Sequence, residues 1–341
     1  MKKFLSVAVA AAAVTTSAVA ANMENPLFLP RGGQVYSKTS IGLMYKKTDD
    51  TKSQVLNNHD GAKEFPIWRP TQELGVGITD RWALHAIAGY TYNPDIDRKG
   101  FHLGRVGTTY RVIDSFDGFV WDLYGDFHLG GMEKMKGALT MTAVGEPVFK
   151  YANFSNGRWG YHFGTKFGKK WSEWTMSAFV EGLQTFGNHN NEIDIKQFKA
   201  FTSAYVNPYF STLPDVLSVN LDSTWEINAG ANLFYQIDDR WSAGLGFRYN
   251  YHATNGLESV YTDLSNSPEP IQEAVAGQLK EYKDMHDHFN EYIWNFTVAY
   301  QMRDSVQVAW YIEDTYDTGA YLSSNTTDLK LETGFRLNLK F

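Results

Sequence analysis

The sequence predicts an all-β protein, built as one transmembrane antiparallel β-barrel of about 12 strands. Three observations carry this prediction. Apolar and polar residues alternate with period two over much of the chain, short polar turns join these segments in pairs, and the amino terminus has the pattern of an export signal. The 341 residues include no cysteine and have a formal net charge of -7. These figures exclude thiolate chemistry and disfavour a nucleic-acid partner.

The first 20 residues are predicted to be a cleaved signal peptide. Lys2 and Lys3 form a short positive segment, residues 4–14 are almost wholly apolar, and Ala18-Val19-Ala20 fits a small-residue cleavage site. No later apolar run approaches 18 residues, so no membrane-spanning helix is expected. We therefore expect residues 21–341 to form a single barrel domain.

The clearest hairpin lies in the second half of the chain. Apolar residues from Ile227 to Ile237 alternate with polar or small ones, and the same pattern resumes from Trp241 to Tyr251. Only Asp238-Asp239-Arg240 lies between the two segments. Placing Ile237 opposite Trp241 keeps both apolar sets on one face, which makes this a tight hairpin.

Similar turns recur, and longer connections alternate with them. Five short turns are expected near residues 79–81, 113–118, 168–171, 238–240 and 303–305. Six long connections are expected near 50–66, 93–100, 130–156, 185–219, 254–288 and 317–326. No proline interrupts an alternating run, as expected because proline cannot donate to a sheet ladder. Eleven connections join twelve strands.

The carboxyl-terminal strand decides between β architectures. Its apolar face runs from Leu329 through Phe335 to a terminal Phe341, opposite a polar face from Asp328 to Lys340. This strand resembles the last strand of Gram-negative outer-membrane β-barrel proteins of the porin-like type. The resemblance is architectural, covers nearly all of the mature chain and points to no narrower family. It implies an outer-membrane location, contact with outer-membrane lipids, short periplasmic turns, long extracellular loops, and an assembly machinery that reads the Phe341 strand.

Physical reasoning agrees with this resemblance. A sheet in hydrocarbon must close on itself so that every backbone polar group is paired. The apolar faces then point outward to lipid, the polar faces line the lumen, and aromatic side chains gather at the two interfaces. A soluble β-sandwich would have the same periodicity, but it gives no reason for the Phe341 strand.

The polar faces predict the residues that line the lumen. Turn geometry is expected to place Arg105 opposite Asp126, Thr109 opposite Asp122, Lys166 opposite Glu173 and Glu226 opposite His252. Both charge signs are represented, which indicates ion pairs across a narrow polar passage or a plugged interior. The predicted lumen-lining residues are Arg105, Arg111, Asp122, Asp126, His128, Lys166, Glu173, Glu226, Arg248, His252, Glu332 and Arg336.

Two long loops are rich in apolar residues. Residues 254–288 are expected to carry a short amphipathic helix that begins near Ser267, and residues 185–219 are too apolar for a solvated coil. We expect the two loops to lie together and to narrow the outer mouth.

These features predict a passive outer-membrane channel for small polar solutes. The alternatives are a non-conducting barrel whose loops bind a partner or ligand, and an outer-membrane hydrolase. Asp122, Asp126 and His128 share a face and could serve acid–base chemistry, but no nucleophile, P-loop or zinc-protease motif is found. The run of Asp284, His286, Asp287 and His288 is typical of a solvated surface. We predict no catalytic residue, metal site or cofactor.

Overall fold

The computed structural model describes residues 22–48, 66–94, 98–129, 136–141, 147–151, 158–206, 208–221, 223–253, 257–261, 269, 273, 289–318 and 327–341. The predicted signal peptide, most of residues 254–288 with the expected helix, and the Asp284–His288 run lie outside these residues.

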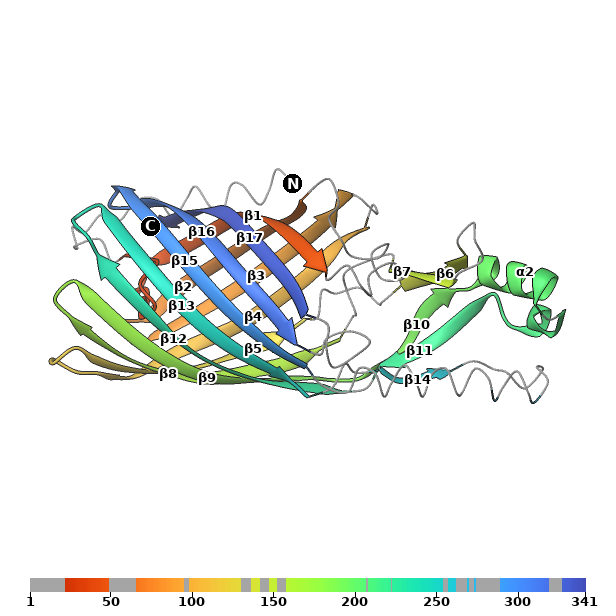
Figure 1. Ribbon diagram of the computed structural model, residues 1–341. Helices are drawn as coiled ribbons and strands as arrows, with labels where there is room; N and C mark the ends of the chain where they lie inside the picture. Colours follow the sequence, from red (N-terminus) through yellow and green to blue (C-terminus); the bar gives the residue numbers. More distant parts are fainter. Residues whose placement is uncertain are drawn as a thin grey trace.

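Twelve antiparallel strands form a closed barrel, as the sequence predicts (Figure 1). Its strands are β1 (Val35–Thr48), β2 (Ile67–Thr79), β3 (Trp82–Asn93), β4 (Arg98–Asp114), β5 (Phe119–His128), β8 (Gly160–Trp171), β9 (Trp174–Thr185), β12 (Thr224–Gln236), β13 (Trp241–His252), β15 (Phe289–Arg303), β16 (Val306–Thr318) and β17 (Thr327–Lys340). Each strand pairs with its neighbours in the chain, and β1 closes the barrel against β17. At the seam, the Val35 amide donates to the Phe341 carbonyl at 3.1 Å, and the Phe341 amide donates to the Val35 carbonyl at 2.8 Å.

The two faces of the wall differ as period-two alternation requires. Large apolar side chains such as Trp241, Trp294 and Phe335 stand exposed on the outer face. Aromatic rings pair there near the short-turn end, where Trp174 lies 4.4 Å from Tyr235, centroid to centroid. The inner face carries buried polar groups instead. An apolar outer face and a polar inner face are the reverse of the arrangement in a soluble barrel and are expected of a wall that faces lipid.

The register of β4 against β5 differs from the prediction. Arg111 pairs with Asp122, and Gly107, rather than Arg105, lies opposite Asp126. The shift arises at the turn, because β4 continues to Asp114, which pairs with Val120, and the turn is therefore shorter than residues 113–118. A β-bulge between Arg111 and Ile113 then moves the pairing back by one residue.

The hairpin of β8 and β9 also turns later than predicted. Trp171 pairs with Trp174, so the turn is Ser172-Glu173 rather than residues 168–171. The prediction that Glu173 lines the lumen and opposes Lys166 is therefore wrong. The predicted register of β12 and β13 is confirmed, with Glu226 opposite His252.

A second sheet lies beyond the long-loop end of the barrel (Figure 1). Its strands, in spatial order, are β14 (Leu257–Tyr261), β11 (Val216–Leu221), β10 (Asn188–Asp194), β6 (Lys136–Met141) and β7 (Pro147–Tyr151). Helix α2 (Lys196–Tyr205) and the 3-10 helix η2 (Pro208–Thr212) connect β10 to β11. Within the described ranges, no helix has the length and apolar character needed to cross a membrane.

The two apolar loops meet, because β11 from residues 185–219 pairs with β14 from residues 254–288. Figure 1 shows β10, β11 and α2 extending away from the end of the barrel. In its described residues, the 185–219 loop therefore prolongs the wall and does not cross the opening as we expected.

Candidate functional site

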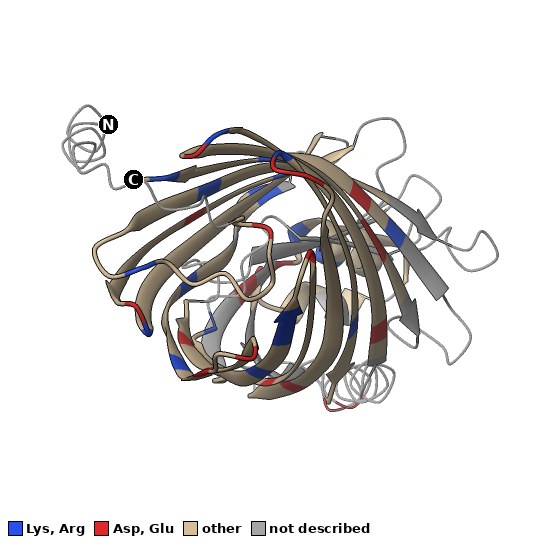
Figure 2. Ribbon diagram, turned by 90° about the vertical axis from the view of Figure 1, so that its left-hand side faces the viewer, with Lys and Arg blue, Asp and Glu red and all other residues tan. Residues whose placement is uncertain are grey.

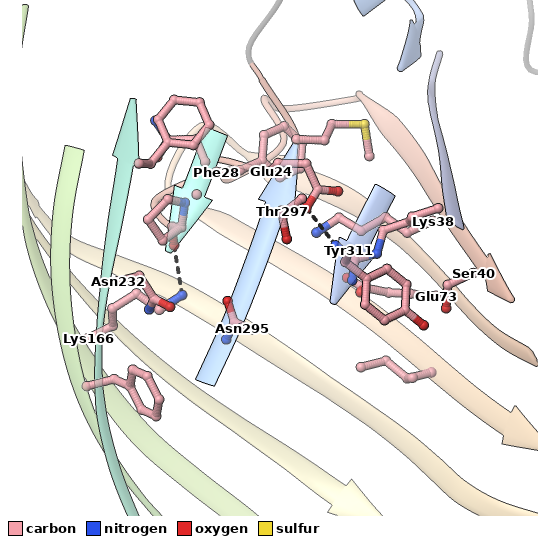
Figure 3. A pocket seen from close by; sticks show the side chains of 18 of the residues that line it. Glu24, Phe28, Lys38, Ser40, Glu73, Lys166, Asn232, Asn295, Thr297 and Tyr311 are labelled. Carbon is pink, nitrogen blue, oxygen red and sulfur yellow. Dashed lines mark hydrogen bonds and ion pairs between the residues drawn. The ribbon is translucent and has the colours of Figure 1, made fainter. Parts of the chain in front are cut away.

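The barrel encloses a cavity of about 700 Å³ with a mainly polar lining. Its wall includes charged residues from β1, β2, β5, β8, β9, β13, β16 and β17. Residues 23–26 and 28–30, which precede β1, also line the cavity. Figure 3 shows Glu24 and Phe28 of this segment facing the same space as Asn232 and Asn295 of the wall. We call residues 22–33 the plug, because its residues 23–30 lie against the cavity near the short-turn end of the barrel. Figure 2, which views the barrel from this end, shows chain inside the ring of strands.

Two consecutive turns give the plug its shape. The Glu24 amide donates to Asn22 Oδ1 at 3.0 Å, and the Leu27 amide donates to Asn25 Oδ1 at 2.9 Å. Asparagine favours such turns because its side chain reaches the backbone two residues ahead. Asn25 Nδ2 also donates to Thr175 Oγ1 on β9 at 2.9 Å. The same side chain therefore forms the turn and anchors it to the wall.

Asn22 attaches the start of the plug to one side of the barrel. Its Nδ2 donates to Gln236 Oε1 at 3.0 Å and to Ser242 Oγ at 2.8 Å, and its Oδ1 accepts a hydrogen bond of 2.8 Å from Gln307 Nε2. These partners come from β12, β13 and β16. A single amide side chain thus joins three strands.

The middle of the plug reaches the opposite side. Lys166 Nζ donates to the Pro26 carbonyl at 2.9 Å, and Arg111 donates to the Leu27 carbonyl at 2.8 Å. The Leu27 side chain is 1% exposed and fills the space that a Cβ atom on Gly168 would occupy. Charged donors on β4 and β8 and one buried apolar side chain therefore hold this part in place.

Glu24 is the only carboxylate of the plug, and it is fully partnered. Arg336 donates to Glu24 Oε2 at 2.6 Å, and Asn338 donates to Glu24 Oε1 at 2.7 Å. Burial acts to raise the pKa of the Glu24 carboxyl, but the charges of Arg336 and Lys38 and the two hydrogen bonds outweigh it and lower the pKa. Docking therefore favours the ionised carboxylate.

This shift predicts acid release of the plug. A carboxyl group whose pKa is lower when docked stabilises docking above its ordinary pKa of about 4.3, and this contribution is lost as the pH falls below that value. We expect the plug to be released more often at pH 3.5 than at pH 7, which ionic current across planar bilayers measures. The Glu24→Gln variant serves as the control and should lose most of this pH response. An equal response in both proteins would contradict the assignment to Glu24.

A second polar cluster lies on the wall above the plug contacts. Asp126 accepts from His85 at 2.5 Å and from His162 at 2.7 Å, and His162 Nε2 lies 3.2 Å from Glu181 Oε2. Tyr124 also donates to Glu181 at 2.8 Å. In the described residues, neither histidine is bonded to a serine or threonine hydroxyl. The cluster therefore presents no nucleophile–base pair, and it includes neither Asp122 nor His128.

The other predicted lumen residues lie on the inner face, apart from Glu173. Arg111 makes a two-pronged ion pair with Asp122, at 2.8 and 3.1 Å, and both residues are buried. Further ion pairs of the wall are Glu226 with His252 at 3.1 Å, His252 with Glu291 at 3.0 Å, and Arg69 with Glu332 at 2.6 Å. Among the residues that the structure describes, no group of acidic or histidine side chains is arranged to hold a metal ion.

The plug is the feature that sequence reasoning missed. Residues 22–33 show no alternation and contain two prolines, and the sequence predicts no element there. The apolar residues Met23 and Leu27 indicate that this segment is buried, because it forms no strand whose lipid-facing side could explain them. Both are buried, at 3% and 1% exposure.

No protein-family model matches this sequence, and no curated protein matches it. Among solved structures, the chain is similar to an outer-membrane channel from Pseudomonas putida F1, with 10% identity over 96% of this chain and 100% of that chain and a TM-score of 0.51. It also matches the NanC porin, with 8% identity over 87% of this chain and 98% of that chain and a TM-score of 0.42. The first comparison carries the conclusion that this chain has the fold of outer-membrane β-barrel proteins.

Proposed function

We propose that this protein is a passive channel for small polar solutes in the outer membrane of a Gram-negative bacterium, held closed at rest by its plug. The observation that carries the proposal is the polar cavity of about 700 Å³ that ends on residues 23–30. A barrel of 12 strands is wider than the eight-stranded barrels that side chains can fill. The Pseudomonas putida relative, itself described as a channel, adds support.

The plug is held in a way that allows release. Apart from a short bridge between Gly32 and Gly77, its described contacts are side-chain hydrogen bonds and the burial of a few side chains. A hydrogen bond contributes about 1 kcal/mol net between neutral groups and about 1.5–3 kcal/mol where one group is charged, as at Glu24, Lys166 and Arg111. Fixing the backbone of each plug residue costs about 1–2 kcal/mol, which offsets these contributions. The docked and released states are therefore close in free energy.

Placement in the outer membrane is part of the proposal. The outer face is apolar and aromatic, as contact with lipid requires. Phe341 closes the seam with Val35 and is 44% exposed on the outer face. This position makes it accessible to an assembly machinery that recognises a terminal aromatic residue.

Conductance across planar bilayers tests the channel directly. We expect discrete openings from full-length protein whose heat-dependent mobility shift in detergent shows that the barrel is folded. Folded protein that never conducts, with or without its plug, would contradict the channel. That outcome would favour a non-conducting barrel that binds a partner through the sheet of β6, β7, β10, β11 and β14, which lies beyond the barrel end.

A smaller change tests the plug itself. Leu27→Ala should raise the fraction of time that the channel is open, because truncating a buried leucine costs about 2 kcal/mol or more. Leu29→Ala is the matched control, since Leu29 is only half-buried. Single-channel recordings at neutral pH provide the measurement. If the two variants open equally often, burial of Leu27 does not hold the plug.

A further inference from the structure

The carboxylates of the lumen are almost all neutralised or bound within the wall. Of the acidic residues that line the cavity, every one except Glu313 has a hydrogen bond or an ion pair. They are Glu24 with Arg336, Glu73 with Tyr36, Asp122 with Arg111, Asp126 with His85 and His162, Glu181 with Tyr124, and Glu332 with Arg69. The presence of both charge signs on the inner face therefore does not mean that both are equally available to a solute.

Two arginines stand apart from this pairing. In the described part of the chain, Arg105 on β4 and Arg248 on β13 make no hydrogen bond or ion pair, and the Nε atom of each is buried without a partner. A buried donor without a partner costs free energy, more so in a charged group. Glu313 lies in the field of Arg248 but does not bond to it. In the described residues, neither guanidinium group is therefore committed to a partner in the wall.

The strand order places these arginines on nearly opposite walls. Between β13 and β4 lie four strands on one side of the barrel and six on the other. Each arginine also lies six residues along its own strand from a residue that contacts the plug. On β4 Arg105 lies six residues from Arg111, and on β13 Arg248 lies six residues from Ser242. Six residues span about 20 Å along a strand. Both guanidinium groups therefore lie above the plug, toward the extracellular mouth.

We infer that Arg105 and Arg248 form a binding site for small oxyanions, carboxylate or phosphate, and that the open channel prefers anions. This inference rests on the proposed channel function. A guanidinium group presents a planar fork of donors that matches the oxygen atoms of a carboxylate or a phosphate. It also stays charged at every physiological pH. Two such groups on facing walls attract an anion into the lumen without closing the passage.

Reversal potentials in a potassium chloride gradient test the selectivity. We expect open full-length channels to pass chloride in preference to potassium. The ratio of the two permeabilities should fall about threefold for each of Arg105→Gln and Arg248→Gln, because each removes one charge facing the permeating ion. Glu313→Gln should raise the ratio. Arg81→Gln is the matched control, since it removes the same charge from an exposed short turn.

Inorganic phosphate serves as the probe for binding. Added at millimolar concentration from the extracellular side, it should reduce chloride current through the wild-type channel, and Arg105→Gln with Arg248→Gln should abolish this block. Acetate, tested in parallel, distinguishes carboxylate binding from phosphate binding. If these variants still conduct but keep the wild-type ion selectivity and the wild-type block by phosphate, the anion-binding site is wrong and the proposed channel function stands. A folded barrel that never conducts would overturn the proposed function, and the inference with it.

Discussion

Deleting residues 22–33 is expected to raise single-channel conductance about threefold or more, because the deletion clears the plug from a lumen that 12 strands make wide enough for water. These residues form the inner end of the cavity and are attached to strands on opposite walls through Asn22, Pro26 and Leu27. The barrel strands begin at Val35, so the pairing between strands is kept, and in the described residues the wall loses one backbone hydrogen bond, from the Gly33 amide to the Gly77 carbonyl. Open events should also last longer.

The matched control keeps the length of the chain and removes only the anchors. A glycine–serine segment in place of residues 22–33 leaves the same number of residues in front of β1 but lacks every side-chain contact of the plug. It should give frequent, irregular openings of nearly the conductance of the deletion. Both proteins must retain the heat-dependent mobility shift. Conductance equal to that of the wild type in both would show that the plug does not close the lumen.

Replacing Asp122 by alanine is expected to destabilise the barrel by about 3–5 kcal/mol, because it removes the buried partner of the Arg111 guanidinium. The more distant carboxylate of the exposed Asp114, at 3.6 Å, does not replace its two hydrogen bonds. Arg111 and Asp122 are 5% and 2% exposed and form two hydrogen bonds at 2.8 and 3.1 Å. The double change Arg111→Met with Asp122→Leu should recover most of the loss, since it removes both charges. Urea unfolding in lipid vesicles, followed by tryptophan fluorescence, gives the free energies.

An exposed ion pair provides the control for this experiment. Lys169 and Asp117 lie 3.3 Å apart with side chains 51% and 65% exposed. Replacing Lys169 by glutamine should leave the unfolding midpoint unchanged, because solvent screens such pairs. Arg111→Met should also increase channel opening, since Arg111 donates to the Leu27 carbonyl of the plug. A loss of unfolding free energy in Asp122→Ala no greater than in Lys169→Gln would contradict the stabilising role of the buried pair.

The local parts of the fold could be read from the sequence, and the parts that depend on distant contacts could not. Alternation from Ile227 to Tyr251 predicted the hairpin of β12 and β13 with its register, because a slip of one residue would turn every side chain to the wrong face. The same argument placed Arg105 opposite Asp126 and was wrong by two residues. A slip of two residues keeps each face intact, so the hydrophobic pattern alone does not reveal that β4 continues to Asp114 and that the turn is shorter than predicted.

For the candidate site too, the sequence predicted the local features and not those that depend on distant contacts. Alternation identified Arg111, Asp122, Asp126 and Arg248 as inward-facing, because period two assigns each side chain to a face. It did not say which charges are paired. The ion pair of Arg111 with Asp122, the bonds of Asp126 with two histidines, and the unpaired guanidinium of Arg248 depend on register and on which strands are neighbours. Glu173 was misplaced because the hairpin turn falls later than its residue types suggested.

By itself, the sequence determined that this protein is a closed antiparallel barrel of 12 strands with an apolar outer face. A strand in contact with both lipid and lumen must alternate, and such alternation is visible in any one segment. Only the tertiary structure decided that residues 22–33 lie inside the lumen. Their contacts are with β4, β8, β9, β12, β13, β16 and β17, which lie far away along the chain. No local periodicity encodes a segment whose position depends on strands that become neighbours only when the barrel closes.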